Sequence, residues 1–161
     1  MGATESWGPE ALQQLRELYE PLRRFAAVIG RWDVDPDDLV QNAYTKVLVK
    51  DPAQIRDLGP YLRRTIVNLA TDERRRSSRA NLAVRRLGPV PTSADSYPSD
   101  LEDLMRLQPR VRALLYLVEV EGHQIGDAAE LVGMSSSNAR VVLMRARRRL
   151  RSDLAVEASG E

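Results

Sequence analysis

QIGDAAELVGMSSSNARVVLMRAR, residues 124–147, has the spacing of a helix-turn-helix. Ala128 and Ala129 are small at the place where a second helix must cross the first closely. Gly133 follows the first helix, where a left-handed backbone is needed, and one of the serines at 135–137 can cap the second helix. In such a motif, polar residues at the start of the second helix enter the major groove while arginines contact phosphates. The stretch therefore predicts a DNA-binding module.

The second helix of this motif is predicted to have a buried face and a basic outward face. Helical spacing predicts buried side chains at Ile125, Leu131, Ala139, Val142, Leu143 and Leu150. Residues 136–152 contain six arginines and no acidic residue, and these cations repel one another unless an anion is present. A solvated arginine face on an ordinary helix pair would explain the charge, but not the small residues, glycine and serine together. We expect DNA contacts from Ser136, Ser137, Asn138, Arg140, Met144, Arg145, Arg147 and Arg148.

The rest of the chain also has helical periodicity, and no segment alternates convincingly like a strand. The expected helices span residues 9–29, 36–50, 59–79, 100–107, 109–121, 124–132 and 136–154. Gly30 is expected to end the first helix, and the turn at residues 33–36 to cap the second.

The predicted fold class is all-α, with two small helical domains joined by a flexible linker. The expected domains are residues 9–80 and 100–154, with the linker at 81–99 and a tail at 155–161. The linker contains three Pro, three Ser and one Gly. Its apolar residues Leu82, Val84 and Leu87 could dock on a domain.

Composition excludes several kinds of site. The chain of 161 residues has no cysteine and one histidine, so a disulfide framework, a thiolate zinc site and a two-histidine metal site are impossible. It has no glycine-rich phosphate loop, and Asp35, Asp37 and Asp38 are adjacent residues on a solvated turn. We therefore expect no enzymatic activity and no cofactor. His123 is interpreted as a surface or boundary residue.

The charges are nearly balanced in number, with 24 basic and 23 acidic residues, but they are segregated along the chain. Residues 1–50 have an acidic excess, whereas 51–80 hold seven basic residues against four acidic ones. Opposite blocks suggest one surface for a polyanion and another for a basic or apolar partner. No signal peptide and no apolar run of ~18 residues is present, so we expect a cytoplasmic protein without membrane contact.

Four segments, in order, resemble the extracytoplasmic-function sigma factors of the sigma-70 family of bacterial RNA polymerase. They are DDLVQNAY at 37–44, PYLRRTIVNLATDERR at 60–75, LQPRVRA at 107–113, and EG at 121–122 followed by the helix-turn-helix. The resemblance implies a protein that binds core RNA polymerase and directs it to promoter DNA. The first domain would bind the clamp coiled coil of the β′ subunit and open the −10 element. The second would read the −35 element beside the β flap, and an anti-sigma factor is a possible further partner.

The resemblance also implies roles for individual residues. The polymerase-binding set would be Asp37, Asp38, Leu39, Gln41 and Asn42. The −10 set would be Tyr61, Arg63, Arg64, Asn68, Arg74, Arg75 and Arg76, and the outward face of the helix-turn-helix would be the −35 set. Two alternatives stay open here: Tyr61 as a core side chain or a stacking platform, and Asn68 as a packing amide or a base contact.

Some residues depart from the family pattern. Asn42 replaces a common Glu, Ala128 a usual Ile, and Val141, Val142 and Met144 stand where polar, basic or aromatic residues are frequent. These changes predict fewer direct base contacts by the second helix.

The alternative function is a stand-alone helix-turn-helix regulator whose N-terminal module serves dimerisation or sensing.

Overall fold

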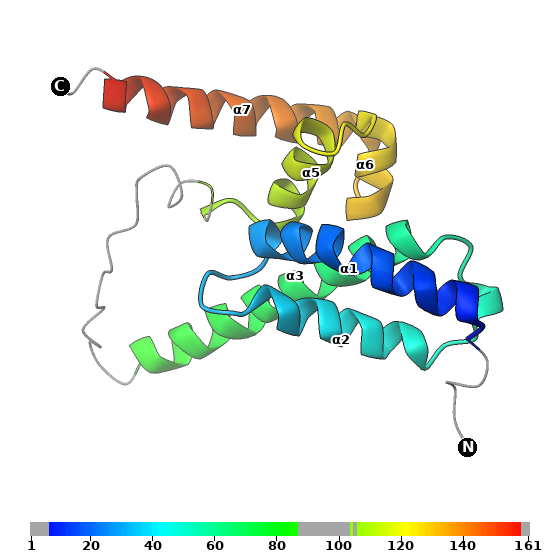
Figure 1. Ribbon diagram of the computed structural model, residues 1–161. Helices are drawn as coiled ribbons and strands as arrows, with labels where there is room; N and C mark the ends of the chain where they lie inside the picture. Colours follow the sequence, from blue (N-terminus) through cyan, green and yellow to red (C-terminus); the bar gives the residue numbers. More distant parts are fainter. Residues whose placement is uncertain (1–6, 87–103, 105, 159–161) are drawn as a thin grey trace.

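The computed structural model describes residues 7–86, 104 and 106–158, and its regular elements are all helical. The elements are α1 (Pro9–Ile29), α2 (Pro36–Leu48), the 3-10 turn η2 (Pro52–Gln54), α3 (Leu58–Arg85), α5 (Pro109–Glu119), α6 (Ile125–Val132) and α7 (Ser136–Ala158). None of the described residues is in a strand. The predicted fold class is confirmed: two helical domains, α1–α3 and α5–α7, lie one above the other in Figure 1.

Side-chain caps fix where several of these helices begin. Asp35, Asp51 and Asp57 each accept a hydrogen bond from the amide two residues further on, at 2.9, 3.0 and 3.2 Å. Ser135 Oγ accepts one from the amide of Asn138 at 3.2 Å and caps α7. Each cap satisfies an amide that has no partner within its own helix. Of the three serines considered from the sequence, Ser135 is therefore the cap.

Two glycines end helices for different physical reasons. Gly133 has φ 72° and ψ 38°, and the amide of Met134 donates to the Ala129 carbonyl at 2.8 Å, as expected for a left-handed stop. Gly30 also ends its helix, but its backbone is extended, with φ −67° and ψ 173°. A Cβ at Gly30 would lie 2.7 Å from Leu39 Cδ1. A larger residue at this position would therefore displace the Leu39 side chain of α2 from its present place.

The N-terminal domain is built around one apolar core. Helix α1 contributes Phe25, and α3 contributes Leu62 and Ile66, all fully buried. From α2, Val40 and Val47 pack into the same cluster. The acidic start of α2 therefore keeps a fixed orientation relative to α3.

The C-terminal domain has the predicted helix-turn-helix. Ala128 and Ala129 are buried, as are Ala139 and Leu143 across the turn, so small residues do lie where α6 meets α7. Leu131 is buried as well, while Ile125, Val142 and Leu150 are half-buried against the core. The predicted buried face of the motif is thus confirmed.

Some boundaries differ from the expected ones. Helix α3 continues to Arg85, into the segment expected to be linker, and α7 continues to Ala158, into the expected tail. Leu82 and Val84 are exposed on α3 and do not dock. The remaining linker residues, 87–99, and most of the helix expected at 100–107 lie outside the described residues, as does Leu87.

The two domains pack directly against each other, which the sequence patterns did not predict. Helix α5 contacts α1 and α3, and α6 contacts α3. At the centre, the rings of Phe25 and Tyr116 meet edge to face with centroids 5.7 Å apart. Arg112 on α5 is 3% exposed and donates to the carbonyls of Val28 at 2.8 Å and Gly30 at 3.2 Å, and also to Ile29.

Candidate nucleic-acid interface

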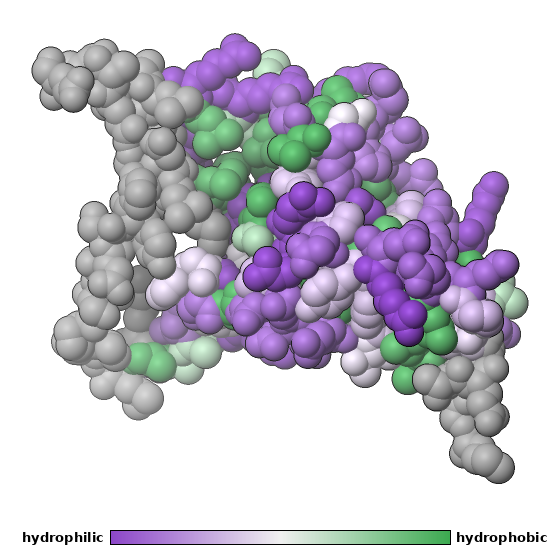
Figure 2. Space-filling view, viewed as in Figure 1, coloured by the Kyte–Doolittle hydropathy of each residue, from purple (hydrophilic) through white to green (hydrophobic). Residues whose placement is uncertain are grey.

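The start of α7 presents the predicted −35 set as an exposed surface. Ser136, Ser137, Asn138, Arg140, Met144, Arg145 and Arg148 all lie exposed. On the opposite side, Ala139, Leu143 and Ala146 are buried and hold the helix against the rest of the domain. Figure 2 shows the same division: the outer edge of α7 is hydrophilic, and apolar side chains gather on the side turned toward α5.

Arg147 differs from the other members of the −35 set. Its side chain is partly covered, and its Nε donates to Glu119 Oε1 at 2.7 Å. Met144, Arg147, Arg148 and Arg151 line a hollow of about 550 Å³ along α7. The hollow has three guanidinium groups and no carboxylate in its lining, so it suits a phosphate.

The residues of the predicted −10 set, in contrast, do not form one surface: they lie in several different places along α3. Tyr61 and Asn68 line one hollow of about 420 Å³ beside the end of α2. Asn68 is exposed, so the interpretation of Asn68 as a buried packing amide is wrong. Tyr61 is half-buried against the core, with Lys50 Nζ 5.8 Å from its ring centroid. Its ring therefore serves the core and still borders the hollow.

The same hollow is lined by the two lysines of the chain, Lys46 and Lys50, which were absent from the predicted site. Both lie exposed at or just beyond the C-terminal end of α2. The signal in the sequence was their position, four residues apart, in a chain whose other basic residues are arginines. They add two positive charges next to Asn68, and Asp72 adds one negative charge to the same lining.

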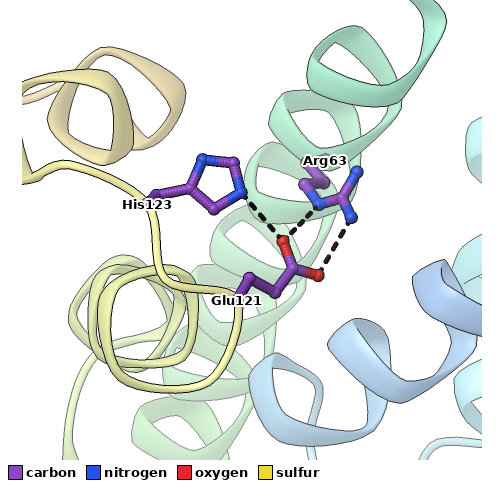
Figure 3. A network of polar contacts seen from close by, with 3 residues as sticks. All are labelled: Arg63, Glu121 and His123. Atoms are coloured by element: carbon purple, nitrogen blue, oxygen red, sulfur yellow. Dashed lines mark hydrogen bonds and ion pairs between the residues drawn. The ribbon is translucent and has the colours of Figure 1, made fainter.

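Arg63 faces the C-terminal domain instead of solvent (Figure 3). Its Nε and Nη2 donate to the two carboxylate oxygens of Glu121, at 3.1 and 2.9 Å. His123 Nε2 lies 3.1 Å from the same carboxylate, which places His123 at a boundary, as expected. The Arg63 and Glu121 side chains are only 13% and 17% exposed.

Arg64 and Arg74 also reach across to the C-terminal domain. Arg64 Nη2 donates to the carbonyl of Glu130 at 3.0 Å, and Arg74 Nη1 donates to the carbonyl of Leu107 at 2.8 Å. Arg63, Arg64 and Arg74 are therefore engaged within the chain, although the sequence placed them at a DNA surface.

The last two arginines of the −10 set point to two further places. Arg75 lines a hollow of about 360 Å³ together with Arg74, Arg79 and Arg110, at the junction of the two domains. Arg76 instead borders a hollow of about 440 Å³ whose other charged residues are Asp33, Asp35, Asp38 and Glu73. Arg76 thus lies beside the acidic residues at the start of α2, away from Tyr61 and Asn68.

The predicted polymerase-binding set is only partly available at the surface. Asp38, Gln41 and Asn42 are exposed and line the acidic hollow. Leu39 is 3% exposed and belongs to the core, so its side chain is not part of the surface that these residues present. The helical period explains this, since Leu39 lies on the same face of α2 as Ala43.

Asp37 is held by neighbouring side chains of α1. It accepts hydrogen bonds from the Tyr19 hydroxyl at 2.7 Å and from Arg23 Nε at 3.0 Å. The hydrogen bond to Asp37 raises the pKa of the Tyr19 phenol above its ordinary value. Asp37 therefore helps to fix α2 on α1, in addition to any role at the surface.

Arg112 is the residue of the domain interface that the sequence reasoning missed. Burial, and then the nearby charge of Arg74, lower the pKa of Arg112 to about 10. Its position inside the LQPRVRA segment was visible in the sequence, but no local signal distinguishes it from an exposed arginine. Among the described residues there is no cluster that could hold a metal ion, and no helix there is long and apolar enough to cross a membrane.

Comparisons with known proteins cover both domains. Residues 15–80 match the family model "Sigma-70 region 2", and residues 104–150 match "Sigma-70, region 4". The chain is 27% identical over 152 residues to the ECF RNA polymerase sigma factor SigM of two Mycobacterium tuberculosis strains, Erdman and H37Rv. Each alignment covers 86% of this chain and 74% of the relative.

Two solved structures have a similar fold. One is the sigma factor RpoE in complex with the anti-sigma factor NepR from Bartonella quintana, with a TM-score of 0.73 and 23% identity. That match covers 92% of this chain and 99% of the other. The second is CnrH in complex with the cytosolic domain of CnrY, with a TM-score of 0.65, 24% identity and coverage of 96% and 93%.

Proposed function

The chain belongs to the extracytoplasmic-function sigma factors of the sigma-70 family, alternative sigma factors that direct RNA polymerase to promoters, and on that premise we propose how its residues divide this work. Residues 9–80 bind polymerase and open the −10 element, and residues 100–154 read the −35 element. This division of roles between the two domains is supported by two exposed surfaces, one on α7 and one between α2 and α3.

The −35 element is read by the exposed start of α7. Ser137, Asn138 and Arg140 lie on its first turns, where the helix of such a motif meets base edges in the major groove. Arg145 and Arg148 lie further along and contact phosphates. Arg147 needs to leave Glu119 before it can do the same. Val141 and Met144 offer apolar contacts, so sequence readout depends on few polar groups.

The −10 element is held as a single strand in the hollow between α2 and α3. Asn68 carries both a donor and an acceptor, which suits the edge of an unstacked base. The ring of Tyr61 lines the wall, and Lys46 and Lys50 neutralise the adjacent phosphates. Arg75 continues the positive path along α3, and Arg63, Arg64 and Arg74 join it when the C-terminal domain moves away.

Core polymerase is contacted by the exposed acidic and amide residues of α2. Asp38, Gln41 and Asn42 suit a basic coiled coil such as that of the β′ clamp, and Leu39 supports them from the core. Asp37 contributes its carboxylate to the same contact, and Tyr19 and Arg23 of α1 hold this carboxylate in place by hydrogen bonds. The β flap is the partner of the C-terminal domain.

The protein acts by positioning polymerase and DNA, without a cofactor and without catalysing a reaction itself. Its place of action is the cytoplasm, where polymerase meets the chromosome. The two solved structures with this fold contain an anti-sigma factor or a cytosolic domain as partner, and we extend an anti-sigma partner to this chain. A stand-alone dimeric regulator is not favoured, because both sigma-70 regions are present in order.

Run-off transcription with core polymerase and a panel of promoters tests the function. The protein should stimulate transcription from some templates as one copy per polymerase. No stimulation from any template, together with a stable homodimer on palindromic DNA, would establish the dimeric regulator instead.

The role of Asn68 is tested by Asn68→Ala in the same assay. We expect normal polymerase binding but weak opening of the −10 region, measured as reduced permanganate reactivity of its thymines. Asn81→Ala is the matched control, because Asn81 is also exposed on α3 but lies outside the hollow. Equal reactivity in the two variants would contradict the proposed base contact.

A further inference from the structure

Two neighbouring hollows beside α3 and the start of α5 are lined by arginines. Their volumes are about 350 and 360 Å³, and they share Arg74, Ser78 and Pro109. Of the described residues, no carboxylate lines either hollow. We call the two hollows together the arginine cleft. Its arginines are Arg31, Arg74, Arg106 and Arg112 in the first hollow, and Arg74, Arg75, Arg79 and Arg110 in the second.

Two arginines of the cleft lie close together on one uncharged acceptor. Arg112 Nη1 donates to the carbonyl of Leu107 at 2.7 Å, and Arg74 Nη1 donates to the same carbonyl at 2.8 Å. A carbonyl oxygen satisfies these donors without neutralising their charge. Burial, and then the nearby charge of Arg74, lower the pKa of Arg112 to about 10, so Arg112 is still charged at neutral pH. An anion held beside two such cations reduces their repulsion.

Other groups in the arginine cleft are of the kind that bind phosphate. Arg79 and Arg106 are exposed, and their guanidinium forks match the geometry of a phosphate. The Nε of Arg110 is buried and makes no hydrogen bond with the described residues. The start of α5 borders both hollows through Pro109, so the positive end of the helix dipole adds to the field. So many positive groups favour a ligand with several negative charges.

One aromatic ring accompanies these arginines. Trp32 lines the first hollow and is 63% exposed, although tryptophan is highly buried on average. It is the single aromatic side chain among the described residues of the two linings. A nucleobase stacks well on an exposed aromatic face. One ring beside many guanidinium groups suits one base with several phosphates, whereas a nucleic-acid strand has one phosphate for each base.

The size and the place of the cleft also suit a small ligand. Each hollow falls within the range of about 300–1,000 Å³ that is usual for small-molecule sites. The arginine cleft shares no lining residue with the hollow that contains Asn68. We propose that it binds a nucleoside triphosphate, with the base on Trp32 and the phosphates among Arg74, Arg79 and Arg106. This site goes beyond the proposed function and does not depend on it.

Isothermal titration calorimetry of the full chain with three probes tests the site. ATP has both base and phosphates, inorganic triphosphate has only the phosphates, and adenosine lacks them. We expect ATP to bind roughly 10-fold more tightly than triphosphate, because one base stacks on the protein. Adenosine should not bind measurably, since it lacks the charge. Equal affinities of ATP and triphosphate would overturn the nucleoside ligand, and no binding of either would overturn the site.

Trp32→Ala separates stacking from a general effect on the fold. The substitution should weaken ATP binding roughly 10-fold and leave the affinity for triphosphate within about twofold of wild type. Trp7 and Trp32 are the two tryptophans of the chain, so Trp7→Phe leaves Trp32 as its one fluorophore of this kind. ATP should quench this fluorescence more strongly than triphosphate does. An equal loss of affinity for both ligands in Trp32→Ala would contradict the stacking contact.

The arginines are tested by Arg79→Gln combined with Arg106→Gln, one from each hollow and neither in the proposed −10 set. Binding of both ATP and triphosphate should weaken at least roughly 10-fold, because charge-assisted hydrogen bonds are lost. The matched control is Arg16→Gln with Arg24→Gln, both exposed on α1 and outside the two linings. It makes the same change in net charge. An equal loss in the control would show general attraction and overturn the inference; circular dichroism melts verify folding.

A short thymidine oligonucleotide distinguishes a nucleotide from a nucleic-acid strand. We expect it to compete poorly with ATP for the arginine cleft. Tighter binding than ATP, lost in the same double arginine variant, would assign the cleft to promoter DNA and overturn the inference. These titrations contain no polymerase, so their failure would leave the proposed function intact. Failure of run-off transcription would in turn leave the nucleotide site intact.

Discussion

The two surfaces proposed to bind promoter DNA differ in how the fold treats their arginines. On α7, Arg140, Arg145 and Arg148 lie exposed, and their guanidinium groups make no hydrogen bond or ion pair with the described residues. On α3, Arg63, Arg64 and Arg74 are held by the opposite domain.

The difference follows from how many neighbours each helix has. Helix α7 packs through one stripe of small and apolar residues, so its other faces stay exposed. Helix α3 contacts α1 and α2 on one side and α5 and α6 on the other. The first half of α3, residues 58–71, has few exposed positions, and polar side chains there become contacts between elements. The same residue type is therefore exposed and without an internal partner among the described residues on one helix, and a structural contact on the other.

The largest expected difference between the arginines of α3 and those of α7 is in the stability of the protein without DNA. Arg63→Ala should lower the free energy of unfolding by about 2–4 kcal/mol, because the Glu121 carboxylate loses both bonds from the guanidinium and keeps only the His123 ring as a neighbour in a poorly solvated place. Arg145→Ala should change it by less than about 0.5 kcal/mol, as for most exposed substitutions. Urea unfolding followed by circular dichroism measures both. Similar values for the two variants would mean that Arg63 is not engaged in solution.

The second expected effect is on DNA binding, and here the substitution on α7 has the larger effect. Arg145→Ala should weaken binding to a −35 duplex by ~1–3 kcal/mol if it makes a bidentate contact. Arg149→Ala on the same helix, also exposed but outside the proposed set, is the control for loss of charge. Salt titrations of both variants separate a specific contact from general attraction. An unchanged affinity and salt slope in Arg145→Ala would remove it from the interface.

The smallest effect tests how the exposed surface is kept in place. Ser135→Ala removes the cap of α7 and should cost about 1 kcal/mol of stability. Since the first turn of α7 holds Ser137 and Asn138, duplex binding should weaken too, whereas single-strand binding should not. Thermal melts and anisotropy with the two probes give both quantities. A loss of single-strand binding equal to the duplex loss would mean that the two surfaces are not independent.

Much of this fold could be predicted because its signals are local. The 3.6-residue period gave α1 with both of its ends correct, the left-handed stop at Gly133 and the buried alanines of the motif. The resemblance gave Leu39 a role in polymerase binding, but the period of its own helix places Leu39 on the buried face, and the structure has it buried. Tyr61 and Asn68 lie together as expected, but Lys46 and Lys50 come from another helix and needed tertiary structure to join them.

By itself, the sequence determined that the chain is helical and that its C-terminal domain contains a helix-turn-helix. Each of these depends on residues within a few turns of one another. Only the tertiary structure decided which arginines are accessible, that Leu39 packs directly against Gly30, and that Arg112 is buried at the end of α1. These depend on contacts between residues up to 84 positions apart, for which no local pattern carries a signal.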